Sequence, residues 1–524
     1  MRMSTRRTFS DRLVRLWRRA AREDGFTALA AIATLAITSA LATAAFVAAD
    51  SDTHLTQHDL EQKRAYLAAR AGVNEFLHHL NQQTNYWDQC PTKAKTTVPG
   101  STDPTLKYSY QPVPANGESA CDTNRPIDTM IDFGTGTFRM RFSGYSGTPE
   151  VSRNIVASFR RNSPLDYLWY TVYETLDPNT QSDPVARAQE CAKWHRQGRP
   201  NECNIDWITG DVMNGSMYTQ DQYSVCGSPV FGRDPTDQIA SLASTPFFTG
   251  CSPSNANIKG TPTKAPYIPL PTYNTQLRDD AAAGAGTIYS GPTVVQLNGP
   301  TAKVTNNGVT GAPIDLNLQP IIYVENGPGG CSSTYSPYNV DYTSALSGDC
   351  GDVYVTGNYS QGVTIAAAND VVIGDPAGGV RGDITTNLNG PAMLALVANN
   401  FVRVMHGCSN DQDDLAYTTK NPVIDAAILA LNHSFIVDNY NCGDPSHTGA
   451  LTINGAIAQN FRGTVGTHSG PTVASGYIKN YTYDDRLHSQ EPPYLFDIQD
   501  ASWHIQRETL CDPNSSDPTV GCTG

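Results

Sequence analysis

The first long feature of the chain is an apolar run near its N-terminus. Residues 26–49 are 24 consecutive uncharged residues, mostly Ala, Leu, Ile and Thr. About 20 apolar residues in a helix span the hydrocarbon core of a bilayer, so this run is long enough to cross a membrane. Polar residues then return without a proline, and the pattern predicts one continuous helix over residues 26–82. Its second half is amphipathic, with apolar side chains at helical spacing at Leu60, Leu67, Ala71, Phe76, Leu77 and Leu80.

Strand patterns follow the helix. Residues 136–161 alternate polar and apolar positions between Gly turns, which predicts an antiparallel sheet within residues 83–162. Residues 163–285 contain short strand patterns punctuated by Gly and Asn, and a Pro-rich segment at 260–274. We expect them to form a β-rich connector.

The C-terminal part of the chain is repetitive. Three of its segments share an Ala/Leu-rich strand, an Asn turn and a β-branched or aromatic strand, and the turn residues Asn369, Asn399 and Asn432 stand 30 and 33 positions apart. This period predicts a parallel β-helix over residues 286–500, in which each coil buries its apolar face on the next. A β-sandwich is the alternative, although its strands recur about every 8–12 residues with clearer alternation. Residues 501–524 are expected to form a disulfide-closed C-terminal tail.

The predicted fold class is therefore mainly β, with a long N-terminal α-helix, a small antiparallel sheet and a large head that resembles a parallel β-helix. Charge adds an orientation to this fold. Residues 1–25 hold eight Arg against three acidic residues, a surplus of +5, whereas the whole chain has a net charge of −14, so the remainder sums to −19. A basic segment before an apolar span favours a cytoplasmic N-terminus and an extracellular head. Such an acidic body repels nucleic acid, which excludes DNA and RNA as partners.

All twelve cysteines lie beyond the apolar span. An even number confined to this region is typical of disulfides in an oxidising compartment. The alternative is a metal site, but the chain has no C-x-x-C motif and no Cys/His cluster with zinc-finger spacing. Pairing of close neighbours is the simplest of many connectivities, and it would join Cys90 to Cys121, Cys191 to Cys203, Cys226 to Cys251, Cys331 to Cys350, Cys408 to Cys442 and Cys511 to Cys522.

Two motifs in residues 18–81 resemble a known family. A basic segment ends at Gly25 before Phe26, and the helix continues as QKRAYLAARAGVNEFL at residues 62–77. This region is similar to the class III prepilin leader and stem of PilX-type minor pilins, which belong to bacterial type IV pili. The resemblance implies that a prepilin peptidase cuts between Gly25 and Phe26. It also implies that the apolar half-helix lies in membrane lipid and then packs against other pilin subunits in a filament.

One position departs from the pattern of that family. Most pilins carry Glu at the fifth mature position, where it is thought to neutralise the N-terminal amine of the adjacent subunit, and this chain has Ala30. The C-terminal part resembles, more loosely, the large heads appended to PilX-type stems in Gram-positive, notably actinobacterial, genomes. The alternative interpretation of the N-terminal region is a plain single-span anchor.

Candidate chemistry in the head is sparse. Its only acidic cluster in the repeats is Asp411, Asp413 and Asp414, and alternate carboxylates in a loop can bind calcium. No Gly stands at the middle of that loop and no distant bidentate Glu is in register, so the cluster is a weak calcium candidate beside a plain solvated loop. The chain has no G-x-S-x-G, H-E-x-x-H or P-loop motif. We expect no catalytic residues, no metal and no cofactor.

The sequence favours a structural minor pilin over an enzyme. We expect a low-copy tip or priming subunit that displays a disulfide-closed β-head for surface adhesion, with an unidentified ligand. It would be a single-pass cell-membrane protein or part of a surface pilus. The alternatives are a membrane-anchored β-helix enzyme acting on extracellular polysaccharide, and a surface anchor that does not polymerise.

Overall fold

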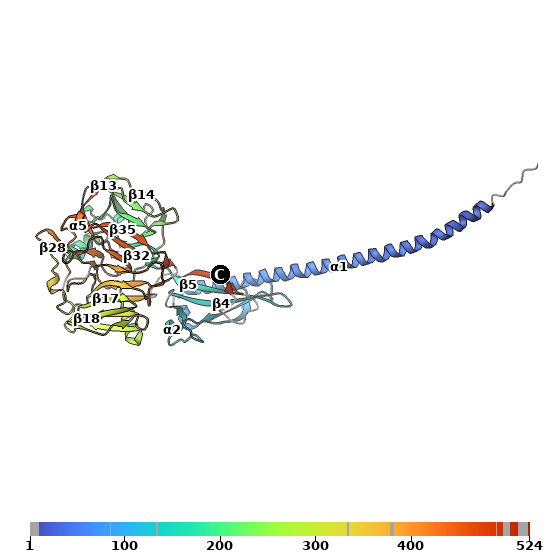
Figure 1. The fold of residues 1–524 in the computed structure, drawn as a ribbon, viewed down its shortest axis with the longest axis horizontal. Helices are drawn as coiled ribbons and strands as arrows, with labels where there is room; N and C mark the ends of the chain where they lie inside the picture. The colour runs from blue at the N-terminus through green and yellow to red at the C-terminus, as the bar shows by residue number, and fades with distance from the viewer. Residues whose placement is uncertain are drawn as a thin grey trace, which may run out of the picture.

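The long helix, a small antiparallel sheet and a large parallel β-helix follow one another along the molecule (Figure 1), which confirms the predicted fold class. We call the helix and the small sheet the stem domain, and the β-helix the head. The computed structural model describes residues 10–83, 85–132, 135–332, 335–377, 382–488, 490–495, 503–511 and 522–523.

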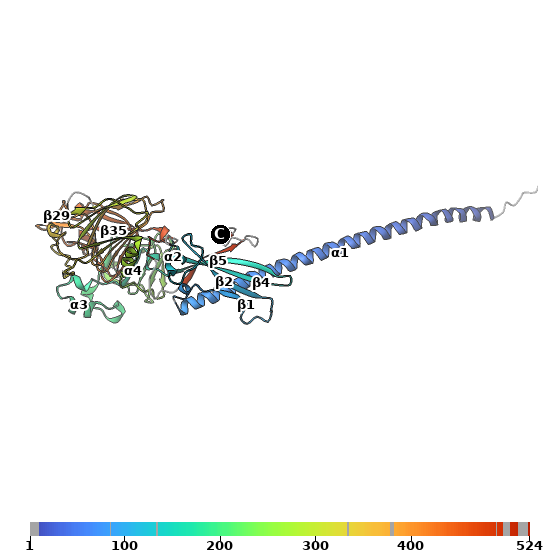
Figure 2. The ribbon, with the colours of Figure 1, turned by 90° about the horizontal axis from the view of Figure 1, so that it is seen from below.

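Helix α1 spans Ser10–Gln82 and ends where the amphipathic pattern ends. Its C-terminal part lies on the small sheet, while the remainder projects alone (Figure 2). Phe76 is the centre of the contact, with its ring centroid 5.2–6.1 Å from those of Tyr110, Phe138, Phe142 and Phe159. The fully buried apolar residues of α1 recur every three or four positions, as a helix face requires; they are Ala65, Ala69, Val73, Phe76 and Leu80.

Two apolar positions of the predicted helix face lie elsewhere. Leu60 and Leu67 are 48% and 61% exposed, so the amphipathic half of α1 has apolar residues on its open side as well. The close approach of the sheet instead depends on a glycine. A Cβ on Gly144 would lie 1.9 Å from the carbonyl oxygen of Ala65 and 2.4 Å from the amide nitrogen of Ala69. Only glycine therefore allows the strand to touch the helix backbone here.

The small sheet contains strands from both ends of the chain. Its strand order is β1-β2-β4-β5-β36-β37, with β3 paired to β4. We expected residues 501–524 to form a disulfide-closed C-terminal tail, but β36 is a strand of the small sheet and pairs antiparallel with β5, with Trp503 opposite Arg161. The head is therefore an insertion between two neighbouring strands of the stem domain. The bounds are β1 Lys93–Thr97, β2 Lys107–Val113, β3 Ile131–Asp132, β4 Thr137–Ser146, β5 Val151–Arg161, β36 Trp503–Cys511, β37 Cys522–Thr523 and the short helix α2 Pro126–Met130.

The head is a stack of parallel strands. One column runs continuously through it, each strand hydrogen-bonded to the next. From end to end this column is β16 Gly286–Ser290, β21 Ile321–Glu325, β23 Val363–Ala367, β26 Leu394–Ala398, β30 Val423–Ala430, β32 Ala450–Phe461, β6 Trp169–Tyr173, β9 Met217–Thr219, β12 Gln238–Ser241 and β15 Thr261–Lys264.

Other parallel strands form the remaining faces of the stack. One set is β17 Thr293–Gly299, β22 Val353–Tyr359, β24 Val371–Ile373, β27 Val402–Val404 and β31 Phe435–Val437. A second is β25 Ile384–Thr385, β35 Ile478–Tyr483, β8 Val212–Asn214, β11 Val230–Phe231 and β14 Asn257–Ile258. A third is β7 Asp206–Ile208, β10 Tyr223–Gly227 and β13 Phe247–Ser254.

The order of the coils differs from the order of the chain. Residues 163–285, which we expected to be a connector, supply the coils from β6 to β15. The last coil of the repeats then pairs with the first coil of the head, since Ile457 on β32 is opposite Trp169 on β6. At this junction the buried Glu174 accepts hydrogen bonds from Trp169 and from Arg462. The two halves of the head are thus stacked in reversed order and joined by a buried ion pair.

The predicted Asn turns stack on one another between coils. The side-chain amide of Asn399 donates to the carbonyl of Ala368 at 3.3 Å, that of Asn432 to the carbonyl of Asn399 at 2.7 Å, and that of Asn460 to the carbonyl of Asn432 at 3.0 Å. Each corner therefore satisfies a backbone carbonyl that a simple loop would leave open.

A strap outside the stack joins its two ends. Residues 265–285 run from β15 to β16, a distance of roughly 40 Å at about 4.8 Å per strand. In the strap's Pro-rich part, every third residue faces the stack, as expected for three residues per turn of polyproline II. Hydroxyls of three coils hold it, since Tyr218 on β9 donates to Pro266, Tyr170 on β6 to Ile268 and Tyr323 on β21 to Asn274. The inward positions are Ala265, Ile268, Asn274 and Leu277.

Short hairpins and helices decorate the outside of the stack (Figure 1). Three antiparallel strands follow β17, and two further hairpins lie farther along the chain. The bounds are β18 Thr301–Asn306, β19 Val309–Thr310, β20 Ile314–Asp315, β28 Gly407–Ser409, β29 Gln412–Asp414, β33 Gly466–Ser469, β34 Thr472–Gly476, α3 Pro184–Cys191, α4 Thr275–Asp280, α5 Pro445–Thr448 and a π-turn at Ala281–Ala285.

Candidate functional site

The projecting half of α1 exposes apolar side chains along its length, among them Ile32, Leu35 and Phe46. Residues Ala31–Ala48 have a mean hydropathy of 2.0, and none of this stretch is buried inside the molecule. By length and composition it is able to cross a membrane. Gly25 and Phe26, the expected processing site, fall within α1 where the side chains lie outside the described residues.

A buried ion pair joins the head to the stem domain. Arg160 on β5 is 2% exposed and holds Glu491, on the segment that returns from the head, at 3.0 Å (Nε to Oε1). The same guanidinium donates to the carbonyls of Leu487 and His488, both at 3.0 Å, and lies 3.4 Å from Asp166. Arg160 therefore binds both the outgoing and the returning segments of the insertion.

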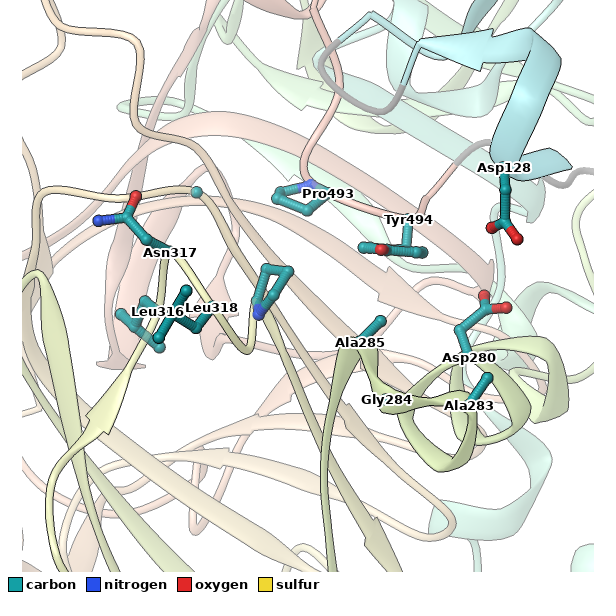
Figure 3. Close-up of a pocket in the computed structure, with 12 residues that line it drawn as sticks. Asp128, Asp280, Ala283, Gly284, Ala285, Leu316, Asn317, Leu318, Pro493 and Tyr494 are labelled. Carbon is teal, nitrogen blue, oxygen red and sulfur yellow. The ribbon is translucent and has the colours of Figure 1, made fainter. Parts of the chain in front are cut away.

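A pocket of about 580 Å³ lies beside this junction (Figure 3). Asp128 on α2 and Asp280 at the end of the strap point toward one another at one side of it, and Tyr494 forms part of the wall. Burial raises the pKa of Tyr494, and both carboxylates add to this shift. The pocket thus brings two like charges together where stem domain and head meet.

The disulfides follow the order of the cysteines along the chain. Five of the pairs expected from the sequence are bonded in the structure, with the closest pair 12 and the farthest 34 positions apart. Cys511 is also disulfide-bonded and stands opposite Cys522 in the ladder of β36 and β37. Each bond closes a local excursion from the sheet or the stack and so restricts loops rather than joining distant coils.

The weak calcium candidate does not form a common site. Asp413 accepts hydrogen bonds from His406 at 2.8 Å, from His447 at 3.1 Å and from the amide of Asp444 at 3.0 Å. Asp414 caps the following turn through the amide of Ala416. Within the described residues, the ligand atoms of Asp411, Asp413 and Asp414 do not converge on one point.

One other group of potential ligands does converge in the described residues. Asp206, Cys226 and His468 have ligand atoms within 4.8 Å of one another. Cys226, however, is bonded to Cys251. A disulfide sulfur is not the thiolate that metal binding needs, so these residues do not fit a metal.

The head also contains a sealed cluster of ionisable side chains. Arg403 lies between Asp370 and Asp438, at 3.2 and 2.9 Å. Burial raises the pKa of Asp370 to about 7. Tyr335 and Tyr342, from the loop closed by the disulfide between Cys331 and Cys350, donate to Asp438 at 2.6 and 2.7 Å. The cluster fastens this loop over the stack.

The residues that sequence reasoning missed are those with distant partners. Glu491 is separated from Arg160 by 331 positions, and His447 from Asp413 by 34. Neither pair has a local spacing that a pattern search could detect. The two residues of each pair lie on different elements, which meet only in the folded molecule. In the sequence, the acidic cluster around Asp413 was the only pattern that pointed to the region of either pair.

Comparisons with known proteins add little. No protein-family model matches this chain, and no curated protein matches it in sequence. Among solved structures it is similar to the competence-associated pilin ComZ from Thermus thermophilus, at 12% identity and a TM-score of 0.27, over 86% of this chain and 97% of that chain. At this TM-score the likeness carries no conclusion about fold or function.

Proposed function

We propose that this protein is a minor pilin, a stem-anchored subunit of a pilus-like filament that carries a large head for surface contact. A single observation supports the proposal. In one unbroken helix, residues 65–80 form part of the stem-domain core, whereas residues 31–48 are apolar and exposed. A free soluble helix of this kind would be unstable in water, so its surface needs lipid or other helices around it.

Continuity of the helix distinguishes this arrangement from a simple tether. A membrane span joined to its domain by a flexible linker would let the domain move freely. Here α1 passes from the exposed apolar stretch to the buried face at Ala65 without a break. The stem domain is therefore held rigidly to whatever packs around the apolar half, as a subunit of an ordered filament requires.

N-terminal sequencing tests the proposal. By the resemblance of residues 18–81 to PilX-type stems, the mature protein should begin at Phe26 after cleavage by a prepilin peptidase. Gly25→Ala should leave most of the protein uncleaved. The control Ala45→Ser, a small change in the same helix away from the cut, should be processed normally. A mature protein that begins at Met1, or after Ala49, would show that the chain is not processed as a prepilin.

We further propose that the subunit is low in copy and sits at a filament tip or primes assembly. Ala30 offers no carboxylate to neutralise the amine of a neighbouring subunit, and an unpaired charge in an apolar core is costly. The inserted head also adds bulk to every subunit of a shaft. Immunogold labelling of sheared filaments should mark their ends. Regular labelling along the shaft would contradict a tip role, and labelling confined to the cell membrane would favour a plain anchor.

The proposal assigns no reaction to the head. One of its buried ionisable clusters, around Arg403, is covered by the loop closed between Cys331 and Cys350. A turnover screen with anionic and neutral glycans should therefore give no product. Release of shortened or unsaturated sugars would instead support a polysaccharide-acting enzyme.

A further inference from the structure

A groove of about 1270 Å³ lies on the outside of the head and is separate from the junction pocket. Its floor is the stack at Gly374 and Met405. Its walls come from the hairpin β28–β29, from the segment that follows the hairpin, and from α5. Pockets for drug-sized ligands occupy about 300–1,000 Å³. The groove is thus large enough for several sugar units.

The walls of the groove are fixed to one another. The disulfide between Cys408 and Cys442 ties the hairpin to the turn before α5. Asp413, with a side chain only 1% exposed, accepts hydrogen bonds from His406 on the stack and from His447 on α5. The same buried carboxylate therefore joins the hairpin, the stack and the helix, so the groove exists before any ligand arrives.

Asp413 also sets the hydrogen-bonding role of His447. Nδ1 of His447 lies 3.1 Å from a carboxylate oxygen, which only accepts, so Nδ1 is the atom that carries the proton. In the neutral ring Nε2 is then an acceptor, and the ring is 61% exposed on the groove wall. Asp411, on the hairpin wall of the groove, has no hydrogen-bond partner in the described part of the chain and is a second acceptor. The groove therefore presents acceptors to groups that donate, as hydroxyls do.

Most of the acidic groups of the groove are already occupied. Both oxygens of Asp375 are bound, by Gln296 at 3.0 Å and by the amide of Ala377 at 2.9 Å. Asp444 caps the amide of Ser446 at 2.8 Å. With Asp413 held by its histidines, too few free carboxylates remain for a metal ion or a strongly basic peptide.

An apolar surface completes the site. The ring of Tyr417 lines the groove and packs against Tyr342, with centroids 5.1 Å apart, which fixes its orientation. The face of such a ring can pack against the C–H face of a sugar.

The charge of the head favours a neutral ligand. Residues 163–502 carry 15 Lys and Arg against 32 Asp and Glu, a net charge of −17, which repels anionic glycans over the whole head.

We propose that this groove binds a neutral oligosaccharide, with Nε2 of His447 and the carboxylate of Asp411 accepting hydrogen bonds from its hydroxyls. Tyr417 packs against one of its sugar rings. The proposal rests on the proposed function in one respect, since it supplies the ligand class for the surface contact made by the head.

The test uses the full chain in detergent and an array of neutral, sulfated and uronate-containing glycans, with a lysine-rich peptide as a further probe. We expect retention of one or more neutral glycans. For the best of them, His447→Ala and Asp411→Ala should each weaken binding about tenfold, which is the size of one lost hydrogen bond. Tyr417→Ala should weaken it at least as much. Matched controls are His58→Ala on α1 and Tyr267→Ala on the strap, which should change nothing.

Several outcomes would overturn the groove as a glycan site. They are retention of no neutral glycan, retention only of anionic glycans or of the peptide, and equal loss of binding in the control variants. Since His447 and Asp411 are on the surface, an unchanged unfolding transition separates lost binding from lost fold. N-terminal sequencing of the same sample separates the two proposals: a chain that begins at Phe26 but binds no glycan would refute the groove and leave the filament subunit intact.

Discussion

The ion pair between Arg160 and Glu491 allows the attachment of the head to be weakened by a single isosteric change. Glu491→Gln removes the negative charge and keeps the shape of the side chain, which leaves the buried guanidinium without its main counter-charge. Such a loss costs about 3–5 kcal/mol for a buried pair. Arg160 keeps two carbonyls at 3.0 Å and Asp166 at 3.4 Å, so we expect the lower end of this range, about 3 kcal/mol.

Hydrogen–deuterium exchange measures this loss where it acts. Three kcal/mol corresponds to a rise of roughly 100-fold in the exchange rate of the amides that pair β5 with β36. Peptides from the middle of the head, such as those of β26, should be unchanged. The control is Glu118→Gln. Its carboxylate lies 3.6 Å from Arg125 with both side chains well exposed, and its loss should cost less than about 0.5 kcal/mol.

A double substitution tests whether the pair itself is responsible. In an Arg160→Met background, Glu491→Gln should no longer destabilise the junction, because the buried charge that it would strand has gone. An exchange rate that rises less than threefold in Glu491→Gln, or rises equally in the two backgrounds, would refute this account of the junction.

Three further predictions concern other parts of the chain. Gly144→Ala should destabilise the stem domain by about 1–3 kcal/mol in denaturant unfolding, because the new Cβ would clash with the backbone of α1. The control Gly311→Ala, whose Cβ would have its nearest neighbour atom at 3.9 Å, should change the stability little. Equal effects of the two substitutions would contradict the close contact at Gly144. Replacing Cys331 and Cys350 by Ser should cost about 3 kcal/mol, from the entropy of a loop 19 positions long, and a cost below about 1 kcal/mol would show that the tyrosines alone hold the loop. Burial by itself raises the pKa of Asp413, but hydrogen bonds from two histidines and an amide hold that pKa below its usual value. Its contribution is complete above the unfolded value of about 3.9 and is lost as the pH falls from there through the lowered folded-state pKa. Below about pH 4, amides of β28 and β29 should therefore lose protection relative to their intrinsic exchange rates, and Asp413→Asn should remove this dependence.

The sequence by itself determined the features that depend on local periodicity. The apolar run and the amphipathic spacing predicted residues 26–82 of α1, which itself begins earlier, at Ser10, and alternation with Gly turns predicted β4 and β5. The Asn turns at regular spacing predicted a stack of coils, because each coil must place its corner in the same way for its neighbour to bind. Nearest-neighbour pairing of cysteines agrees with the bonded pairs, since short loops bring such thiols together.

Only the tertiary structure decided which distant segments are neighbours. A strand pattern reports which face of the strand is buried but carries no record of the strand that will lie beside it. The pairing of Trp503 with Arg161, which makes the head an insertion, and that of Ile457 with Trp169, which reverses the order of its halves, therefore left no local trace. The same is true of Glu491 and His447, whose chemistry depends on partners brought close by the complete stack. For the same reason, the prediction that residues 163–285 form a connector was wrong. Their strands are short and are buried by other coils, so their place in the β-helix can be recognised only when those coils are present.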